Sequence, residues 1–180
     1  MTPPGYGRIT ARILEELAAI VGSAHVLTDT DSIALYSRDE TEELSFPPDV
    51  VVRPASTGEV SAIMKLATRE RIPVTPRGAG TGLSGGALAV FGGISLSLER
   101  MNRILEMDTG NLMAVVEPGV ITEVLQTEAE KAGLYYPPDP ASRGSCMMGG
   151  NVAENAGGPH AVKYGVTSDW VTGLTAVMPD

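Results

Sequence analysis

The sequence predicts an α/β (α+β) fold, and two observations carry that prediction. Short apolar runs at 50–52, 72–75 and 94–98 are typical of strands, and residues 56–71 have a capping box followed by helical periodicity. A glycine-rich stretch, residues 76–88, lies just beyond one of these strands. Open α/β sheets usually bind their ligands at such a strand end, so this stretch is a candidate ligand site.

Bulk composition excludes several classes of function. The 180 residues suffice for one or two domains, and the formal net charge of −9 argues against nucleic acid or an anionic membrane surface as the main partner. No apolar run approaches the roughly 20 residues of a membrane span, and no secretory signal opens the sequence. The single cysteine, Cys146, excludes an internal disulfide and fits a reducing compartment, and with only two histidines a zinc site made by this sequence is not expected. We therefore expect a cytoplasmic protein without a metal site in these residues.

Upstream of residue 50, the sequence predicts one well-defined helix. Thr10 is placed to cap a helix whose apolar positions extend from Ile13 to Val21, and Gly22 ends it. Residues 28–49 are acidic and irregular, with a short helix expected near 32–36. We interpret the acidic run as solvated surface.

Downstream of residue 98, the pattern changes from strands to a helix and then to irregular structure. Three further strands are predicted, at 103–107, 112–117 and 171–178. A turn at 108–111 joins the first two, and Thr122 is expected to cap a helix that Gly133 ends. Trp170 is expected in the core.

The stretch 76–88 has the composition of a phosphate-binding loop. Five of its thirteen residues are glycines, and its single charged residue is Arg77. Glycine lets a ligand approach the main chain closely, and clustered backbone N–H groups form a concave anion site. The alternative is a flexible linker, which the flanking apolar strands disfavour. Arg77 could contact a phosphate oxygen directly, or it could cap the loop and pair with an acid.

A dinucleotide-binding pattern within this stretch is misleading. Gly80 to Gly85 match G-x-G-x-x-G, and Glu99 follows at about the expected distance. However, such a loop must open a helix, and residues 86–93 are too short and too rich in glycine for that helix. A Walker loop fails too, because Gly86 stands where its lysine should be. The loop is therefore expected to hold its ligand with irregular backbone.

A second glycine-rich segment spans residues 137–165. It contains six glycines and four prolines, and it is longer than ordinary loops of compact domains. Its apolar residues oppose disorder, and Asn151 and Asn155 would share one face if they were helical. Such a glycine-rich segment with hydrogen-bonding side chains suits a flat heteroaromatic ring system; a purely structural loop is the alternative.

Together the two segments resemble a known family. PRGAGTGLSGGAL and PPDP-x-S-x-x-x-C-x-x-GGN-x-A-x-N-AGG-x-x-x-x-KYG are similar to motifs of the FAD-linked oxidases of the vanillyl-alcohol oxidase type, which have a PCMH-type FAD-binding domain. The resemblance runs from about residue 50 to the end and is weaker upstream. Within the family, the sequence looks like the D-2-hydroxyacid dehydrogenases, a branch that includes the flavin subunit of glycolate oxidase and the D-lactate dehydrogenases.

The resemblance implies two small α/β subdomains that hold FAD. The expected divisions are a lead-in at 1–49, a first FAD-binding subdomain at 50–107 and an incomplete second subdomain at 108–180. The first loop would bind the pyrophosphate, and the second segment would line the ribityl chain and the isoalloxazine. The residues expected to contact the cofactor are Pro76, Arg77, Gly78, Ala79, Gly80, Thr81, Gly82, Leu83, Ser84, Gly85, Pro138, Asp139, Ser142, Cys146, Gly149, Gly150, Asn151, Ala153, Asn155 and Gly157.

The implied activity is oxidation of a 2-hydroxy acid of the glycolate or D-lactate type, with hydride transfer to flavin N5. Electrons would leave to a quinone, a cytochrome or a partner redox subunit, and such a partner could place the protein at the inner membrane. In this branch the catalytic residues, the substrate-binding cap and any divalent metal motif follow later, beyond Asp180. We therefore expect a truncated piece of a longer flavoenzyme, inactive alone; a natural stand-alone protein is the alternative.

Two departures from the family pattern concern the cofactor. Some relatives attach FAD through a histidine four residues after the arginine, where this sequence has Thr81, so noncovalent FAD is expected. Met147 and Met148 replace a hydroxyl residue and an isoleucine before the glycine pair, which is expected to change little. Cys146 is expected to pack beside the cofactor, and His160 is expected to be structural.

Two other functions remain open on the sequence. A noncatalytic module could have kept flavin or nucleotide binding without the chemistry. Another oxidoreductase on the same fold, such as a flavin-dependent reductase of a sugar nucleotide, is disfavoured by the second motif.

Overall fold

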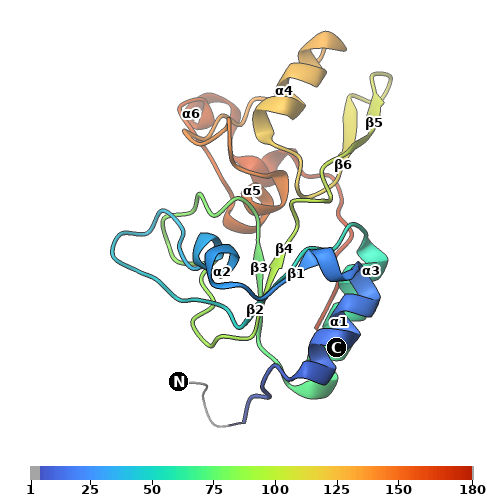
Figure 1. Cartoon of the computed structure of the whole chain (residues 1–180). Coiled ribbons are helices and arrows are strands. Elements are labelled where there is room, and N and C mark those ends of the chain that lie inside the picture. Colours follow the sequence, from blue (N-terminus) through green and yellow to red (C-terminus); the bar gives the residue numbers. More distant parts are fainter. Residues whose placement is uncertain (1–4, 180) are drawn as a thin grey trace. The chain divides into compact units, whose positions relative to one another are not determined.

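The computed structural model describes residues 5–179, which form two compact units (Figure 1). One unit comprises Met1–Arg100 with Thr175–Asp180, and the other comprises Met101–Leu174. The mixed α/β architecture predicted from the sequence is confirmed. The three-part division at residues 49 and 107 stays a prediction.

A four-stranded sheet organises the first unit. Its order is β1-β2-β4-β3. β1 (Val26–Leu27) is antiparallel to β2 (Val50–Val52), and both β2 and β3 (Val74–Arg77) run parallel to β4 (Ile94–Ser97). β3 is an edge strand, and Pro76 is tolerated there because an edge position does not require its missing N–H.

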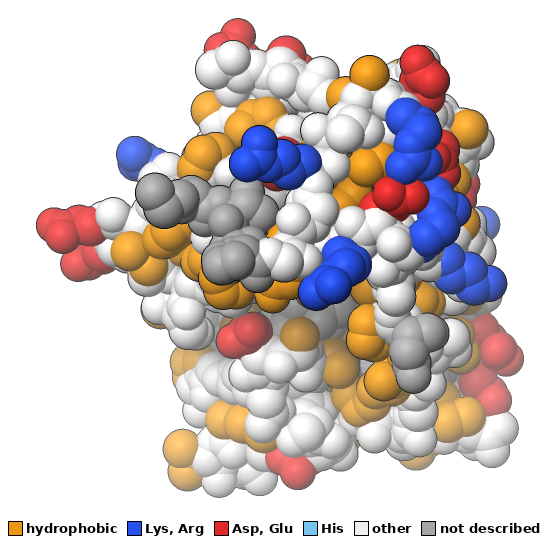
Figure 2. Space-filling view, turned by 90° about the horizontal axis from the view of Figure 1, so that it is seen from below, with side chains coloured by type: hydrophobic (Ala, Val, Ile, Leu, Met, Phe, Trp, Pro, Cys, Tyr) orange, Lys and Arg blue, Asp and Glu red, His pale blue; other side chains and the backbone are white. Residues whose placement is uncertain are grey.

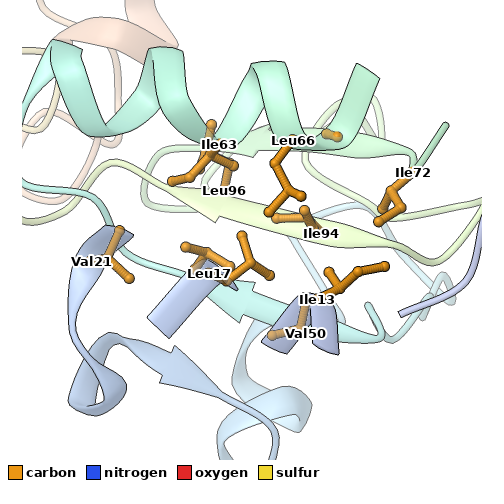
Figure 3. Packing of buried hydrophobic residues seen from close by; sticks show 11 residues of the cluster. Ile13, Leu17, Val21, Val50, Ile63, Leu66, Ile72, Ile94 and Leu96 are labelled. Carbon is orange, nitrogen blue, oxygen red and sulfur yellow. The ribbon is translucent and has the colours of Figure 1, made fainter. Parts of the chain in front are cut away.

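The core of this unit lies where two helices pack on the sheet. Figure 3 shows Leu17 of α1 (Ala11–Val21) and Ile63 of α3 (Thr57–Glu70) beside Ile94 and Leu96 of β4. Alternate residues of a strand face opposite sides of a sheet, so Ser95 and Ser97 point away from this core. Both serines are nevertheless fully buried.

Local capping signals explain why the helices begin where the sequence predicted. Thr10 accepts a hydrogen bond from the Ile13 N–H at the start of α1, and Ser56 accepts one from the Glu59 N–H at the start of α3. The Glu59 carboxylate accepts from the Ala55 N–H at 2.8 Å, one residue earlier than a standard capping box. The short helix α2 (Thr30–Tyr36) is also present.

Exposed ion pairs connect α1 and α3. Arg12 pairs with Glu16 and Glu70, and Arg69 pairs with the same two carboxylates. Figure 2 shows basic and acidic side chains lying beside one another on the face seen from below. Exposed pairs of this kind each contribute little to stability.

The second unit combines a hairpin with helices. β5 (Ile104–Asp108) and β6 (Met113–Val116) are antiparallel, and the Asp108 carboxylate accepts from two N–H groups of the turn. The helices are α4 (Thr122–Lys131), α5 (Met148–Glu154) and α6 (Ala161–Tyr164), followed by a 3₁₀ turn, η2 (Thr167–Trp170). Val120, Leu125 and Met148 form the core between them.

A buried carboxylate fastens the base of the hairpin. Glu117 accepts from the Arg103 backbone N–H at 2.8 Å and from its guanidinium at 2.7 and 3.2 Å. These bonds favour the ionised form, so Arg103 holds the pKa of Glu117 below its ordinary value. The two ends of the hairpin are therefore held together by Arg103 and Glu117.

Three predictions about residues 122–178 are wrong. Thr122 does not cap α4: Ile121 is the N-cap, and the Thr122 side chain turns inward to the Cys146 carbonyl. Residues 171–178 are irregular and pair with no strand among the described residues. Trp170 is 42% exposed, and its indole N–H donates to the Tyr164 carbonyl at 3.0 Å at the surface of η2.

The longest helix in the described part of the chain is α3, with 14 residues. None of the helices described there has the length and the apolar character needed to cross a bilayer.

Candidate cofactor site

The glycine loop of the first unit leaves its N–H groups available. Its first two residues, Pro76 and Arg77, are the end of β3. Within residues 5–179 the backbone N–H groups of 79–84 find no hydrogen-bond acceptor. The loop is mostly exposed from residue 79 to 84, and Gly80 has a φ of +73° that favours glycine. Unsatisfied N–H groups gathered in one loop form a site for an anion such as a pyrophosphate.

Arg77 packs against the loop at Gly80, but its hydrogen bonds go to residues upstream of the loop. Its side chain is buried, and its guanidinium donates to the Arg38 carbonyl at 2.7 Å and the Tyr36 carbonyl at 3.4 Å. It also lies over the Tyr36 ring, 5.5 Å from the centroid. Burial lowers the pKa of Arg77, although an arginine keeps its charge in proteins. This geometry favours the capping role, with carbonyl oxygens as partners in place of the acid that the sequence suggested.

A segment that the sequence did not single out holds the loop. Residues 36–41, here called the strap, receive the Arg77 bonds. The Glu40 N–H donates to the Gly82 carbonyl at 3.1 Å, and the Gly85 N–H donates to the Thr41 hydroxyl at 2.8 Å. Ser37 is buried and Thr41 is half-buried, whereas Arg38 and Glu40 are exposed, so the interpretation of 28–49 as solvated surface holds only in part for the strap. In the sequence, the only hint of the strap is that Tyr36 and Thr41, whose hydroxyl groups form hydrogen bonds in the structure, lie within an otherwise acidic run.

Glu99 has a structural role in this unit. It accepts from the Tyr36 hydroxyl at 3.0 Å and pairs with Arg53 at 3.0 Å. Burial, with the nearby Glu99 charge, raises the pKa of Tyr36, so the phenol keeps its proton and remains a donor. The acidic residue that completed the apparent dinucleotide pattern thus anchors the beginning of the strap.

The PPDP motif in the second unit is tied down by its own contacts. Pro138 is buried, and its carbonyl accepts from the Gln126 side chain at 2.8 Å. The Asp139 carboxylate accepts from the His160 N–H at 2.9 Å, and Gly158 packs so closely that an added Cβ would lie 2.2 Å from the Asp139 carbonyl oxygen. His160 also lies 3.3 Å from the Tyr135 hydroxyl, which agrees with the structural role expected for it.

Asn151 and Cys146 meet in the interior of the second unit. The Asn151 amide donates to the Thr122 hydroxyl at 2.6 Å, and that hydroxyl lies 3.1 Å from the Cys146 sulfur. Both side chains are buried. Met148 packs in the core, whereas Gly149 closes against Pro118, where a Cβ would lie 2.7 Å from the proline Cβ.

The sequence analysis expected Asn151 and Asn155 to share one face if both were helical. They do not, because Asn155 lies outside the helix. The helix α5 ends at Glu154, and Asn155 is its left-handed C-cap with φ of 54°. Its side-chain oxygen accepts from the Ser168 N–H at 2.9 Å. The two amides therefore fasten different parts of the segment.

The remaining predicted contacts of this segment are more open. Gly150 has no atom within 4 Å of a built Cβ, and Ala153 is exposed. Ser142 lies in a turn in which its carbonyl accepts from the Ser145 and Cys146 N–H groups. Gly157 packs near Val166. For these residues, as for those of the glycine loop, contact with the cofactor stays a prediction.

Known proteins match this chain over both glycine-rich segments. A family model described as "FAD binding domain" matches residues 48–180. The chain is 42% identical over 170 residues to the glycolate oxidase subunit GlcD of Bacillus subtilis, covering 94% of this chain and 36% of that protein. It is 41% identical over 181 residues to the D-lactate dehydrogenase of Anaerostipes hadrus, covering 97% and 36% respectively.

A solved structure agrees with the fold. An alkyldihydroxyacetonephosphate synthase superposes with a TM-score of 0.87 at 23% identity, over 97% of this chain and 38% of that one. The chain thus spans little more than a third of the length of the proteins that it matches. The matched family covers most of the chain and both glycine-rich segments, and the free N–H groups of the first loop fit the cofactor that the family binds. The chain belongs to the FAD binding domain family, and its cofactor is FAD.

Proposed function

We propose that this chain is the FAD-holding part of a flavin-dependent dehydrogenase that oxidises a short 2-hydroxy acid of the glycolate or D-lactate class. The glycine loop is the observation that carries the FAD part of the proposal. Its N–H groups at 79–84 are unsatisfied among the described residues, and the one cation in the loop, Arg77, is committed to the strap. The pyrophosphate would be held by backbone dipoles.

The residues of this chain bind and orient the cofactor. N–H groups of the first loop hold the pyrophosphate, and the PPDP and GGN segments of the second unit shape the surface for the ring system. When bound, FAD supplies the acceptor for hydride transfer from the α-carbon of the substrate to flavin N5. The catalytic base and the groups that bind the substrate carboxylate are expected beyond Asp180.

The names of the relatives support the substrate class. One is a glycolate oxidase subunit and the other a D-lactate dehydrogenase, and both are matched over more than nine-tenths of this chain. Each acid carries a hydroxyl group beside a carboxylate, so one reaction type covers both. We include a quinone, a cytochrome or a partner redox subunit as the electron acceptor in this proposal.

FAD is expected to bind without a covalent bond. Thr81 stands where covalent relatives would have histidine, and a threonine hydroxyl is not a comparable nucleophile for flavin attachment. Acid or heat should therefore release all the yellow colour from the purified protein into the supernatant. Flavin fluorescence that remains with the denatured protein band on a gel would contradict this expectation.

Substrate oxidation tests the enzymatic part of the proposal. The natural full-length protein, loaded with FAD, should be bleached under anaerobic conditions by glycolate or D-lactate, and an artificial dye should restore the colour. L-lactate is the matched control for D-lactate, since the two differ only in the configuration of the α-carbon. A protein that binds FAD but is reduced by none of these acids would support the noncatalytic alternative instead.

A further inference from the structure

We propose that the cofactor site begins upstream of the family domain: the strap, residues 36–41, clamps the glycine loop, and Arg77 is the positioning residue that fastens the two together. The family match begins at residue 48, so the strap lies outside it. The inference rests on the proposed binding of the FAD pyrophosphate by the loop.

The strap bonds the loop at three points and leaves the anion-binding groups free. At the beginning of the loop, Arg77 donates to the Arg38 carbonyl; in the middle, the Gly82 carbonyl accepts from Glu40; at the end, the Gly85 N–H donates to Thr41. None of these bonds uses an N–H group of residues 79–84. The loop is thus held in shape without loss of the donors that a phosphate needs.

An arginine suits the first of these points. Its planar guanidinium reaches two carbonyl oxygens of the strap at once and lies over the Tyr36 ring, which a lysine ammonium does not reproduce. Gly80 allows this arrangement, because a Cβ there would lie 2.2 Å from the Arg77 Nη2. The loop therefore folds directly over the guanidinium.

The strap is itself anchored to the framework of the first unit. The Tyr36 hydroxyl donates to Glu99, just after β4, and Glu99 is paired with Arg53, just after β2. Arg53 in turn donates to the Ala24 carbonyl at 3.0 Å. The Ser37 carbonyl accepts from the Phe46 N–H at 2.8 Å, which closes the segment behind the strap. The strap is thus connected to residues at the ends of β2 and β4, and through the strap the loop is held in a fixed place relative to the sheet.

Two pairs of variants test the clamp. Thr41→Val keeps the side-chain shape but removes the acceptor for the Gly85 N–H, and Thr41→Ser restores the hydroxyl. Arg77→Met removes the guanidinium, and Arg77→Lys keeps only the charge. Arg12→Met, on the exposed face of α1, is the control for loss of one positive charge.

The first measurement needs no cofactor. Amide exchange at Gly85 should be slow in the wild-type protein and in Thr41→Ser, and it should accelerate in Thr41→Val. Exchange at Glu40 and Gly85 should accelerate in Arg77→Met. Unchanged exchange in both Thr41→Val and Arg77→Met would overturn the clamp.

The second measurement is the dissociation constant of FAD, from titration of its fluorescence. We expect Thr41→Val to weaken binding about 10-fold and Arg77→Met about 10-fold to 100-fold, as for loss of one or two partly buried hydrogen bonds. Thr41→Ser and Arg12→Met should bind as the wild type does, and Arg77→Lys should lie between. Wild-type affinity in Thr41→Val and Arg77→Met, despite faster exchange, would overturn the role of the strap in the cofactor site. Absence of FAD binding by the wild type would instead refute the proposed function, while the exchange data would still decide the clamp.

Discussion

Gly80→Ala is expected to lower the affinity for FAD by at least roughly 10-fold and to cost about 2–3 kcal/mol in the free energy of unfolding. Two effects add. The φ of +73° is unfavourable for alanine, and the new Cβ would lie 2.2 Å from the Arg77 Nη2. The guanidinium would have to leave the strap carbonyls, which would then be unsatisfied. Fluorescence titration with FAD and urea unfolding measure the two quantities.

Gly82→Ala is the matched control for stability. It lies two residues further along the same loop, its built Cβ has no atom within 4 Å, and its φ is not in the left-handed region. We expect its free energy of unfolding to change by less than about 1 kcal/mol. Equal destabilisation by Gly80→Ala and Gly82→Ala would mean that glycine is needed for general loop flexibility and not for the close approach to Arg77.

Asn151→Leu is expected to lower the free energy of unfolding by about 1–3 kcal/mol, because it removes a hydrogen bond from the interior of the second unit. The amide donates to the Thr122 hydroxyl at 2.6 Å, and both side chains are buried. Leucine has a similar size but no donor, so the Thr122 oxygen loses a partner. Urea unfolding of the protein without FAD is the measurement.

A double-mutant cycle with Thr122→Val separates this role from cofactor contact. If the two side chains stabilise each other, the double variant should be more stable than the sum of the single losses predicts, with a coupling of about 0.5–3 kcal/mol. If Asn151 serves only the cofactor, the single variant should lose FAD affinity while its unfolding in the absence of FAD stays unchanged. That outcome would contradict the structural role assigned to the amide.

Elements with strong local signals could be predicted from the sequence. Thr10 and Ser56 mark the beginnings of α1 and α3, and Gly22 follows the end of α1, because caps depend only on neighbouring residues. Strands β2 and β4 were also evident as buried apolar runs. The two-residue strand β1 was missed, since so short a strand exists only through its pairing with β2.

Features that depend on distant partners could not be predicted. From the sequence, a phosphate and an acidic side chain were both possible partners for Arg77. The carbonyl groups that it binds instead lie about forty residues upstream. Thr122 has the residue type of a cap, but the Cys146 carbonyl, 24 residues away, draws its hydroxyl inward. For the candidate site, composition and the two motifs identified the loop, whereas the strap that shapes it became evident only from tertiary contacts.

Beyond the buried Arg77, the glycine loop carries no charged side chain, and this affects the kinetics of cofactor capture. The chain carries a formal charge of −9, and the cation of the loop is buried beneath it. An anionic dinucleotide approaching such a chain meets net repulsion at long range and attraction only within hydrogen-bonding distance. Added salt screens the repulsion over about 10 Å at 0.1 M and leaves the short bonds largely intact. For this chain we therefore expect added salt to speed the encounter with FAD, the reverse of the behaviour of a site that attracts its ligand with exposed lysines and arginines.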